Sequence, residues 1–233
     1  MKRGLLIILS IFLMLVFCSC HTKEVTQDTI VPNQSTTNNN PEITESELEI
    51  TQKNITISNS YSVKCPVLNS DDFDYSATNT AIEECITLEI EQILDGTETV
   101  SELTTEYTIA LQSSDTISIL YTLYFNSQDS AHPVDFAFGI NTNHSGETLT
   151  LQDILAVDQQ LVSDFKTAWS EQTDEILQNY LDTYTDESLL ELFIQMDSPQ
   201  SNVHFYMTGD AVVIIFPIPR AAGSYVTITL SNA

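Results

Sequence analysis

Six oxygen-bearing side chains in residues 72–83 have the spacing of the ligands in a calcium-binding loop. They are Asp72, Asp74, Ser76, Thr78, Thr80 and Glu83. The glycine that such a loop needs at its sixth position is replaced by Ala77, and Asn79 stands where an apolar residue belongs. The segment therefore favours a polar turn and a helix cap, and we expect neither a metal site nor a cofactor.

The other residue types that do chemistry show no catalytic spacing. The histidines lie far apart, at His21, His132, His144 and His204, which excludes an HExxH zinc helix. The six glycines are too scattered for a GxGxxG or Walker loop, and there is no GxSxG elbow. Folding could still assemble a Ser-His-Asp triad, but no motif indicates one. We expect no catalytic residues and no enzymatic activity.

The charge of the chain is extreme for its length. In 233 residues, 33 Asp and Glu face 7 Lys and Arg, which gives a formal net charge of −26. Phosphate neutralisation needs clustered basic side chains, so a nucleic-acid partner is excluded as a class. A field of this sign would attract a cationic partner and speed its association at low salt. The negative charge can also be interpreted simply as a solvated acidic surface. That interpretation is compatible with attraction of a cationic partner.

The start of the chain predicts export. Lys2 and Arg3 precede an uncharged apolar run over residues 4–17, as in a secretory signal peptide, and the run is shorter than the roughly 20 residues that span a bilayer. It ends in FCSC, which resembles the lipobox of bacterial lipoproteins, with the small Ser19 before Cys20. We expect residues 1–19 to be removed and Cys20 to carry the lipid that holds the protein on the outer face of the bacterial cell membrane. An uncleaved anchor and ordinary secretion are the alternatives.

Cleavage before Cys20 sharpens the charge. The removed segment contains two bases and no acid, so five bases then face 33 acids and the net charge becomes −28. Residues 21–49 are polar and lack aromatic side chains, a composition that cannot offset the entropy of ordering. We expect residues 20–51 to form the lipidated cysteine and a disordered tether, and residues 52–233 to form a single domain. An edge strand is possible only near residues 48–51.

Two cysteines remain in the expected domain, Cys65 and Cys85. An even pair in an exported chain favours a disulfide, because the exterior is oxidising. Closing a loop of about 20 residues would stabilise the fold by roughly 3 kcal/mol. Two buried free thiols are the alternative.

Hydrophobic periodicity predicts an α+β domain with a mostly antiparallel sheet packed against a few helices. Alternation predicts strands over 54–64, 102–112, 116–126, 134–142, 203–208, 211–216 and 224–230. Helical spacing predicts a helix from about residue 81 to Leu94, with Thr80 and Glu83 as its capping box, and further helices over 158–181 and 186–195. The apolar stripe of the helix predicted over 158–181 begins at Leu161 and extends through Ile176 to Tyr180.

Two segments together resemble the RsiV-like C-terminal domain. The first is AHP at 131–133 with the following DFAFGINTNHSGETLTLQDIL, and the second is HFYMTGDAVVIIFPIPRAAGSYVTITL at the end. Upstream, Pro66 and Asn79 fall at matching positions. The family's domains form the extracellular part of lysozyme-sensing anti-sigma factors, and they also occur beside peptidoglycan deacetylases and in stand-alone lipoproteins. The sequence contains neither a sigma-binding segment nor a deacetylase domain, so those two activities are not carried over.

The resemblance implies a non-enzymatic binding or sensing module of the cell envelope, with lysozyme or peptidoglycan as the partner. His132 and Arg220 are the residues to consider for ligand contact. The alternatives are that His132 is only a loop residue before Pro133, and that Arg220 forms an ion pair with an acid on the surface. The alternative functions are a hydrolase or deacetylase accessory for wall polymer, and a structural assembly module that works through an exposed sheet edge.

Overall fold

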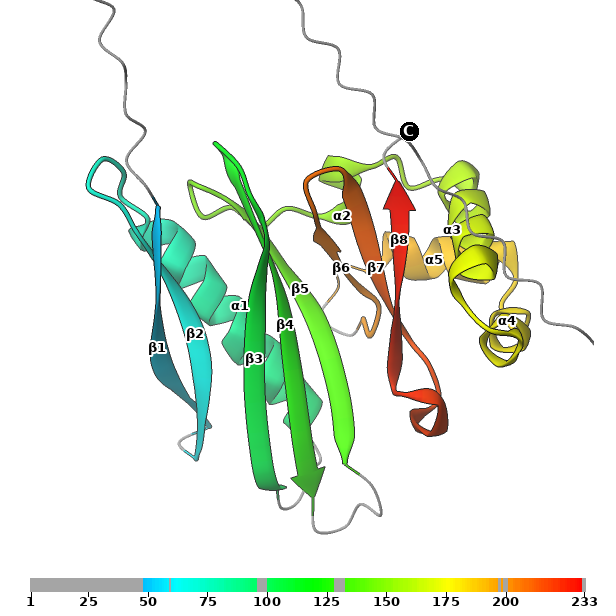
Figure 1. Cartoon of the computed structure of the whole chain (residues 1–233), viewed down its shortest axis with the longest axis horizontal. Helices are drawn as coiled ribbons and strands as arrows, with labels where there is room; N and C mark the ends of the chain where they lie inside the picture. Colours follow the sequence, from blue (N-terminus) through cyan, green and yellow to red (C-terminus); the bar gives the residue numbers. More distant parts are fainter. Residues whose placement is uncertain are drawn as a thin grey trace, which may run out of the picture. The chain divides into compact units, whose positions relative to one another are not determined.

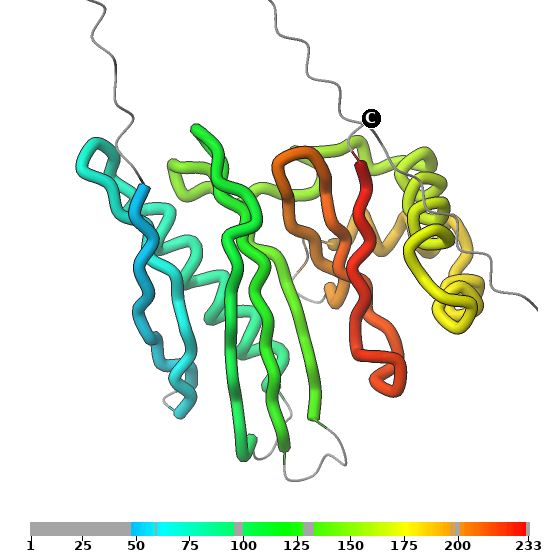
Figure 2. The backbone as a smooth tube through the Cα atoms, in the orientation of Figure 1, coloured from blue at the N-terminus to red at the C-terminus, as the bar shows by residue number. Residues whose placement is uncertain are grey.

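The computed structural model describes residues 48–58, 60–95, 100–127, 133–196, 198 and 201–231. The predicted α+β class is confirmed: the described residues form three antiparallel sheets, β1-β2, β3-β4-β5 and β6-β7-β8 (Figures 1 and 2). The strands are β1 (Glu49–Ile57), β2 (Tyr61–Asn69), β3 (Val100–Gln112), β4 (Thr116–Ser127), β5 (Val134–Asn143), β6 (His204–Met207), β7 (Ala211–Pro217) and β8 (Tyr225–Ser231). The helices are α1 (Ser76–Leu94), α2 (Leu151–Ile154), α3 (Gln159–Gln172), α4 (Glu175–Leu181), α5 (Asp186–Ile194) and the 3-10 turn η1 (Arg220–Ala222). None of the described helices is long and apolar enough to cross a membrane.

The first strand of the prediction is a hairpin in the structure. The alternation over 54–64 continues through a turn, so β1 and β2 pair antiparallel with Ile57 opposite Tyr61. Ser58 takes a positive φ of 51° at this turn. Strand β1 therefore begins at Glu49, within the range left open for an edge strand. Residues 1–47, with the expected signal peptide, Cys20 and most of the tether, lie outside the described residues.

Helix α1 begins earlier than the sequence indicated. It starts at Ser76, and the residue before it, Tyr75, makes no side-chain cap. The predicted capping box at Thr80 and Glu83 is wrong, because both residues already lie inside the helix. Thr80 instead donates its hydroxyl to Ser76 O at 2.9 Å, one turn back. The buried stripe of α1 consists of Ile82, Ile86 and Ile90, together with Thr78.

The central sheet follows the predicted strands closely, and its two faces differ. On one face, Ile119 and Tyr121 of β4 lie opposite Ile140 and Phe138 of β5, and these residues form a core with the isoleucines of α1. On the other face, Ser118 lies opposite Asn141, and Leu120 lies opposite Gly139. This second face is where β6 meets the central sheet.

The join between β5 and β6 is made by side chains and by a glycine. Asn141 Nδ2 donates to Phe205 O at 2.9 Å, and Met207 N donates to Ser118 Oγ at 2.7 Å. Ser118 also donates to Asn141 Oδ1 at 2.7 Å, so the two buried side chains form one network. At Gly139 the strands approach so closely that a Cβ atom would lie 1.6 Å from Phe205 O. No other residue type fits there.

The helical part of the chain is divided where the sequence predicted continuity. The helix expected over 158–181 is two helices, because Thr173 is extended and the carboxylate of Asp174 accepts from Leu177 N to start α4. Ile176, assigned to the apolar stripe, is 73% exposed. The short α2 was not predicted, although Thr150 and Asp153 form a capping box at its start.

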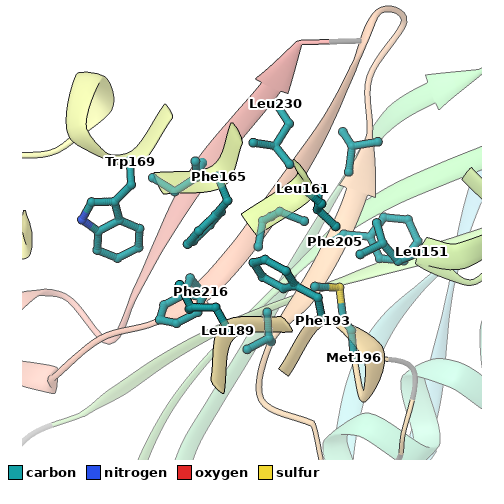
Figure 3. Packing of buried hydrophobic residues seen from close by; sticks show 14 of the residues in the cluster. Leu151, Leu161, Phe165, Trp169, Leu189, Phe193, Met196, Phe205, Phe216 and Leu230 are labelled. Carbon is teal, nitrogen blue, oxygen red and sulfur yellow. The ribbon is translucent and has the colours of Figure 1, made fainter. Parts of the chain in front are cut away.

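A second core lies between these helices and the sheet β6-β7-β8. Figure 3 shows Phe165 and Trp169 of α3 against Phe216 of β7, with Phe193 of α5 beside them. The ring centroids of Phe165 and Phe193 are 5.1 Å apart in an edge-to-face arrangement. Burying each such side chain contributes roughly 1.5–3 kcal/mol to the stability of the fold. This half of the domain therefore has a core of its own, and that core is stabilised by several large side chains.

Candidate binding groove

A groove of about 330 Å³ lies where α1 passes the join of β5 and β6. One wall is a stripe of α1, the floor contains residues of the join, and the other side is formed by 146–149 and by residues that follow α5. The lining residues are Ala81, Glu84, Cys85, Leu88, Glu89, Gln92, Gly139, Asn141, Gly146, Thr148, Leu149, Met196, Ser198, His204 and Phe205. The volume falls at the lower end of the range of small-ligand pockets.

Helical pitch explains why α1 offers these side chains to the groove. Cys85, Leu88, Glu89 and Gln92 recur at three- and four-residue intervals, so they share one face of the helix, next to the buried isoleucine stripe. The start of α1 is fixed against the turn after β5: Thr78 Oγ1 donates to His144 O at 2.8 Å. This contact holds the helix wall in place relative to the floor.

Glu89 is a half-buried carboxyl in this wall. Among the described residues it has neither a hydrogen-bond partner nor an ion pair. Burial raises the pKa of Glu89 to about 7, since the charged form loses solvation without compensation. Its ionisation therefore destabilises the fold as the pH rises from the unfolded-state pKa through about 7.

His204 is a buried imidazole in the floor. Its side chain is 8% exposed, and its Nε2 atom has no hydrogen-bond partner among the described residues. The ring packs against Phe136 and Phe138, with centroids 5.6 and 6.2 Å away. Burial lowers the pKa of His204 to about 4, so the ring is neutral at physiological pH. A neutral imidazole can donate one hydrogen bond and accept one.

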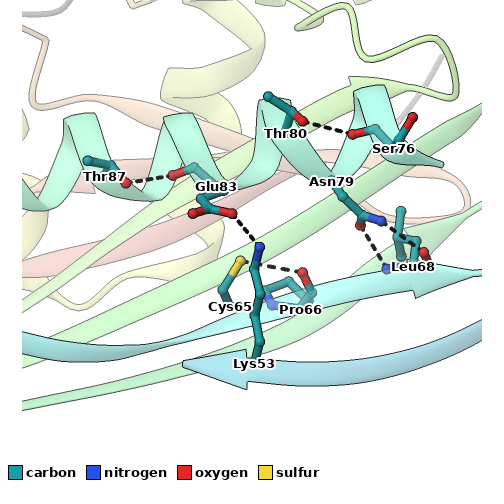
Figure 4. A network of polar contacts seen from close by, with 9 residues as sticks. All are labelled: Lys53, Cys65, Pro66, Leu68, Ser76, Asn79, Thr80, Glu83 and Thr87. Carbon is teal, nitrogen blue, oxygen red and sulfur yellow. Dashed lines mark hydrogen bonds and ion pairs between the residues drawn. The ribbon is translucent and has the colours of Figure 1, made fainter. Parts of the chain in front are cut away.

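The predicted disulfide between Cys65 and Cys85 is contradicted, because both residues are free thiols. Cys65 lies on β2 opposite Lys53 of β1, and Figure 4 shows its side chain beside that of Lys53 and below Glu83. Cys85 is two residues after Glu83 on α1 and therefore points about 200° away around the helix, into the groove. The helix separates the two sulfur atoms, and the alternative of two free thiols is the one observed.

The thiol that lines the groove is not activated. Burial raises the pKa of the Cys85 thiol to about 12, so it is not an activated nucleophile. The Glu89 carboxyl could exchange a proton near neutral pH, but none of the described residues bonds a hydroxyl, an amine or a thiolate to it. What the groove provides is an unneutralised acid, a buried imidazole without a partner, and the apolar side chain of Leu88, which is 59% exposed.

The calcium-loop residues do not converge in the structure. Asp74 accepts from Ser76 N at 2.9 Å, Thr78 bonds to His144 O, and Glu83 pairs with Lys53 (Figure 4). Within the described residues no three metal-ligating side chains come together. The interpretation as a polar turn fits these contacts, although the expected cap is absent.

Of the two residues considered for ligand contact, only Arg220 is among the described residues. His132 lies outside the described residues. Arg220 is exposed in η1 and is not part of the groove lining. The groove residues were missed because they come from three distant segments of the sequence. The only local signal was Cys85, Leu88, Glu89 and Gln92 at helical spacing, of which only the cysteine was assigned a role.

A larger hollow of about 750 Å³ lies beside α3 and β8, but several of its polar groups already have partners. Asp158 caps α3, and Asp164 accepts from Gln160 Nε2 at 2.8 Å. The amide of Gln172 makes two bonds of 2.9 Å with the backbone of Thr229. The smaller groove is therefore the better candidate site.

Comparison with known proteins gives a distant likeness in structure. No family model matches this sequence, and no curated protein matches it at a significant level. A DUF3298 family protein from Pseudomonas aeruginosa PAO1 is similar over 80% of this chain and 90% of its own, at 14% identity and a TM-score of 0.45. A DUF3298 family member from Bacteroides fragilis NCTC 9343 is similar over 80% and 91%, at 13% identity and a TM-score of 0.43.

Proposed function

We propose that this protein is a lipid-anchored, non-enzymatic module of the bacterial cell surface that binds a cationic protein. The export signal and Cys20 support the location, and the resemblance of residues 52–231 to the RsiV-like domain supports the role. Lysozyme is the most concrete partner, because it is cationic and acts at the cell wall.

The observation that carries the choice of a cationic partner is the uncompensated negative charge. The described residues contain three lysines and one arginine. Each lysine is paired with an acid: Lys53 with Glu83, Lys64 with Glu106 and Lys166 with Asp186. The bases of the domain are thus mostly occupied by local partners, and the remaining carboxylates present a field of one sign. Such a field raises association rates by about 10- to 1,000-fold at low salt.

Assembly through sheet edges is less well supported, because side chains cover several edges. Gln172 bonds the outer edge of β8, while Asn141 and Ser118 bond that of β6. These contacts occupy backbone groups that another chain would need. The outer side of β1 is one of the strand edges without a partner strand in the described part of the chain.

Calorimetric titration with lysozyme tests the proposal. We expect binding at about 20 mM salt that weakens strongly at about 300 mM, since the Debye length falls from about 20 Å to below 8 Å. Lysozyme succinylated on its lysines is the matched control, because its charge is reversed while its fold is kept. If native lysozyme does not bind at the low salt, or if the succinylated form binds equally well, the proposed partner is wrong.

A further inference from the structure

Two titratable groups without partners line the same groove, and they come from different elements. Glu89 comes from α1 and His204 from β6, and neither side chain is satisfied by the described residues around it. Buried polar groups are nearly always hydrogen-bonded, so the buried Nε2 atom of His204 calls for an explanation, and the half-buried Glu89 carboxylate in the same groove has no counter-charge. A ligand that supplies their partners would provide it.

We infer that this groove receives one basic side chain, a lysine or arginine, from the surface of the protein partner. The inference rests on the proposed function and names the chemistry of the contact. Glu89 is the counter-charge, Leu88 offers apolar surface to the methylene stem, and His204 lies in the floor. A volume of about 330 Å³ has room for a lysine or arginine side chain.

The charges around the groove agree with a cationic occupant. Glu84 lines the same wall and is exposed, so it adds a second negative charge near the entrance. Cys85 is neutral because its thiol pKa is raised, and His204 is neutral because its pKa is lowered. From the other elements, Gly139, Asn141, Thr148 and Ser198 contribute no charge. The described lining thus contains two acids and no base.

Binding of a cation would also remove the cost of ionising Glu89. A positive charge within about 4–6 Å favours the carboxylate and lowers its pKa by about one unit or more. By linkage, one unit corresponds to about a tenfold tighter binding of the cation to the ionised form than to the protonated form. The affinity for a basic side chain should therefore rise with pH through the titration of Glu89.

A small probe tests this contact independently of lysozyme. Nα-acetyl-lysine methylamide is titrated into the isotopically labelled protein, and the carboxyl carbon of Glu89 and the amides of Gly139 and Asn141 are followed by NMR. Nα-acetyl-norleucine methylamide, which lacks the ammonium group, is the control ligand. We expect the lysine probe to shift these signals and to lower the pKa of Glu89 by about one unit, with little effect from the norleucine probe.

Two variants complete the test. Glu89→Gln should weaken binding of the lysine probe about tenfold at pH 8, while Glu91→Gln, on another face of the same helix, should leave it within twofold. Equal binding of the two probes, or equal loss in the two variants, would overturn the inference. Lysozyme binding that persists in such a case would show that the proposed function holds and that the contact lies elsewhere.

Discussion

The side-chain amide of Asn79 makes both hydrogen bonds that a neighbouring strand would make with Leu68. Leu68 N donates to Asn79 Oδ1 at 2.8 Å, and Asn79 Nδ2 donates to Leu68 O at 2.9 Å (Figure 4). The same edge of β2 is closed at Lys64, whose N–H donates to Thr105 Oγ1 and whose carbonyl accepts from Tyr121 Oη.

Between these two contacts lies Pro66, which has no N–H to satisfy. Its carbonyl accepts from Cys65 Sγ at 3.5 Å. The outward-facing backbone groups of Lys64, Pro66 and Leu68 are therefore all accounted for, without a partner strand. This edge joins the hairpin to α1 and to the central sheet, so Asn79 holds the helix that forms the groove wall.

Replacing Asn79 by leucine should destabilise the fold by about 2–4 kcal/mol, because two partly buried backbone groups of Leu68 lose their partners. Urea denaturation followed by circular dichroism measures the change. Asn69→Leu is the control, since Asn69 is exposed and its loss should cost less than about 0.5 kcal/mol. Similar losses in the two variants would contradict the role assigned to the Asn79 amide.

The Asn79 contact illustrates what could be predicted from the sequence. Pro66 and Asn79 were recognised as matching positions of a family pattern, but their joint role depends on the register of β2 against α1. The strands over 100–143 were predictable because alternation is a local property. Helix starts were less so: Thr80 and Glu83 carry a capping signature inside α1, whereas Thr150 and Asp153 carry one at a real start.

The groove could not be predicted, because its chemistry depends on burial. Glu89 is an ordinary acid in the sequence, and its pKa becomes unusual only when folding half-buries it in the wall of the groove. His204 is likewise one of four scattered histidines until Phe136 and Phe138 enclose it. Whether Cys85 can form a disulfide depends on the side of α1 from which it projects. The count of cysteines does not contain that information, and it favoured a disulfide where the structure has a free thiol.

Gly139→Ala should be strongly destabilising, by about 3 kcal/mol or more, because the new methyl group would overlap the carbonyl of Phe205. Relaxation would have to separate β5 from β6 and break the Asn141 contact. Gly209→Ala is the matched control, since no atom lies within 4 Å of its added Cβ. Midpoints of thermal unfolding would measure both, and a Gly139→Ala protein as stable as Gly209→Ala would refute the close approach.

His204 should make the fold sensitive to mild acid. Its pKa is lowered to about 4 in the folded state, so below about 6.5 the unfolded chain binds a proton that the folded chain does not. Stability should fall by up to about 3 kcal/mol between pH 6.5 and pH 4 from this group alone. His204→Phe keeps a ring against Phe136 and Phe138 and should remove that part of the pH dependence.

Urea denaturation of both proteins at a series of pH values checks the His204 prediction. The difference between wild type and His204→Phe should grow steadily as the pH falls below 6.5. A difference that stays constant down to pH 4 would mean that the imidazole titrates normally in the folded protein.

Cys65 and Cys85 should behave as protected thiols. Burial raises the pKa of Cys65 to about 11 and that of Cys85 to about 12, so little thiolate is present at pH 8. In a chain that carries Cys18→Ser and Cys20→Ser, a thiol reagent should react slowly with the folded protein and should label two thiols after denaturation without reductant. Recovery of no labelled thiol would show that the two cysteines are bonded.

The most direct measurement of the central claim is the affinity of lysozyme for three proteins at pH 8 and low salt: wild type, Glu89→Gln and Glu91→Gln. The two variants lose the same charge from the same helix, so long-range steering changes equally in both. If a basic side chain of the partner enters the groove, Glu89→Gln weakens binding about tenfold and Glu91→Gln changes it by less than twofold. Equal affinities of the two variants would contradict the account.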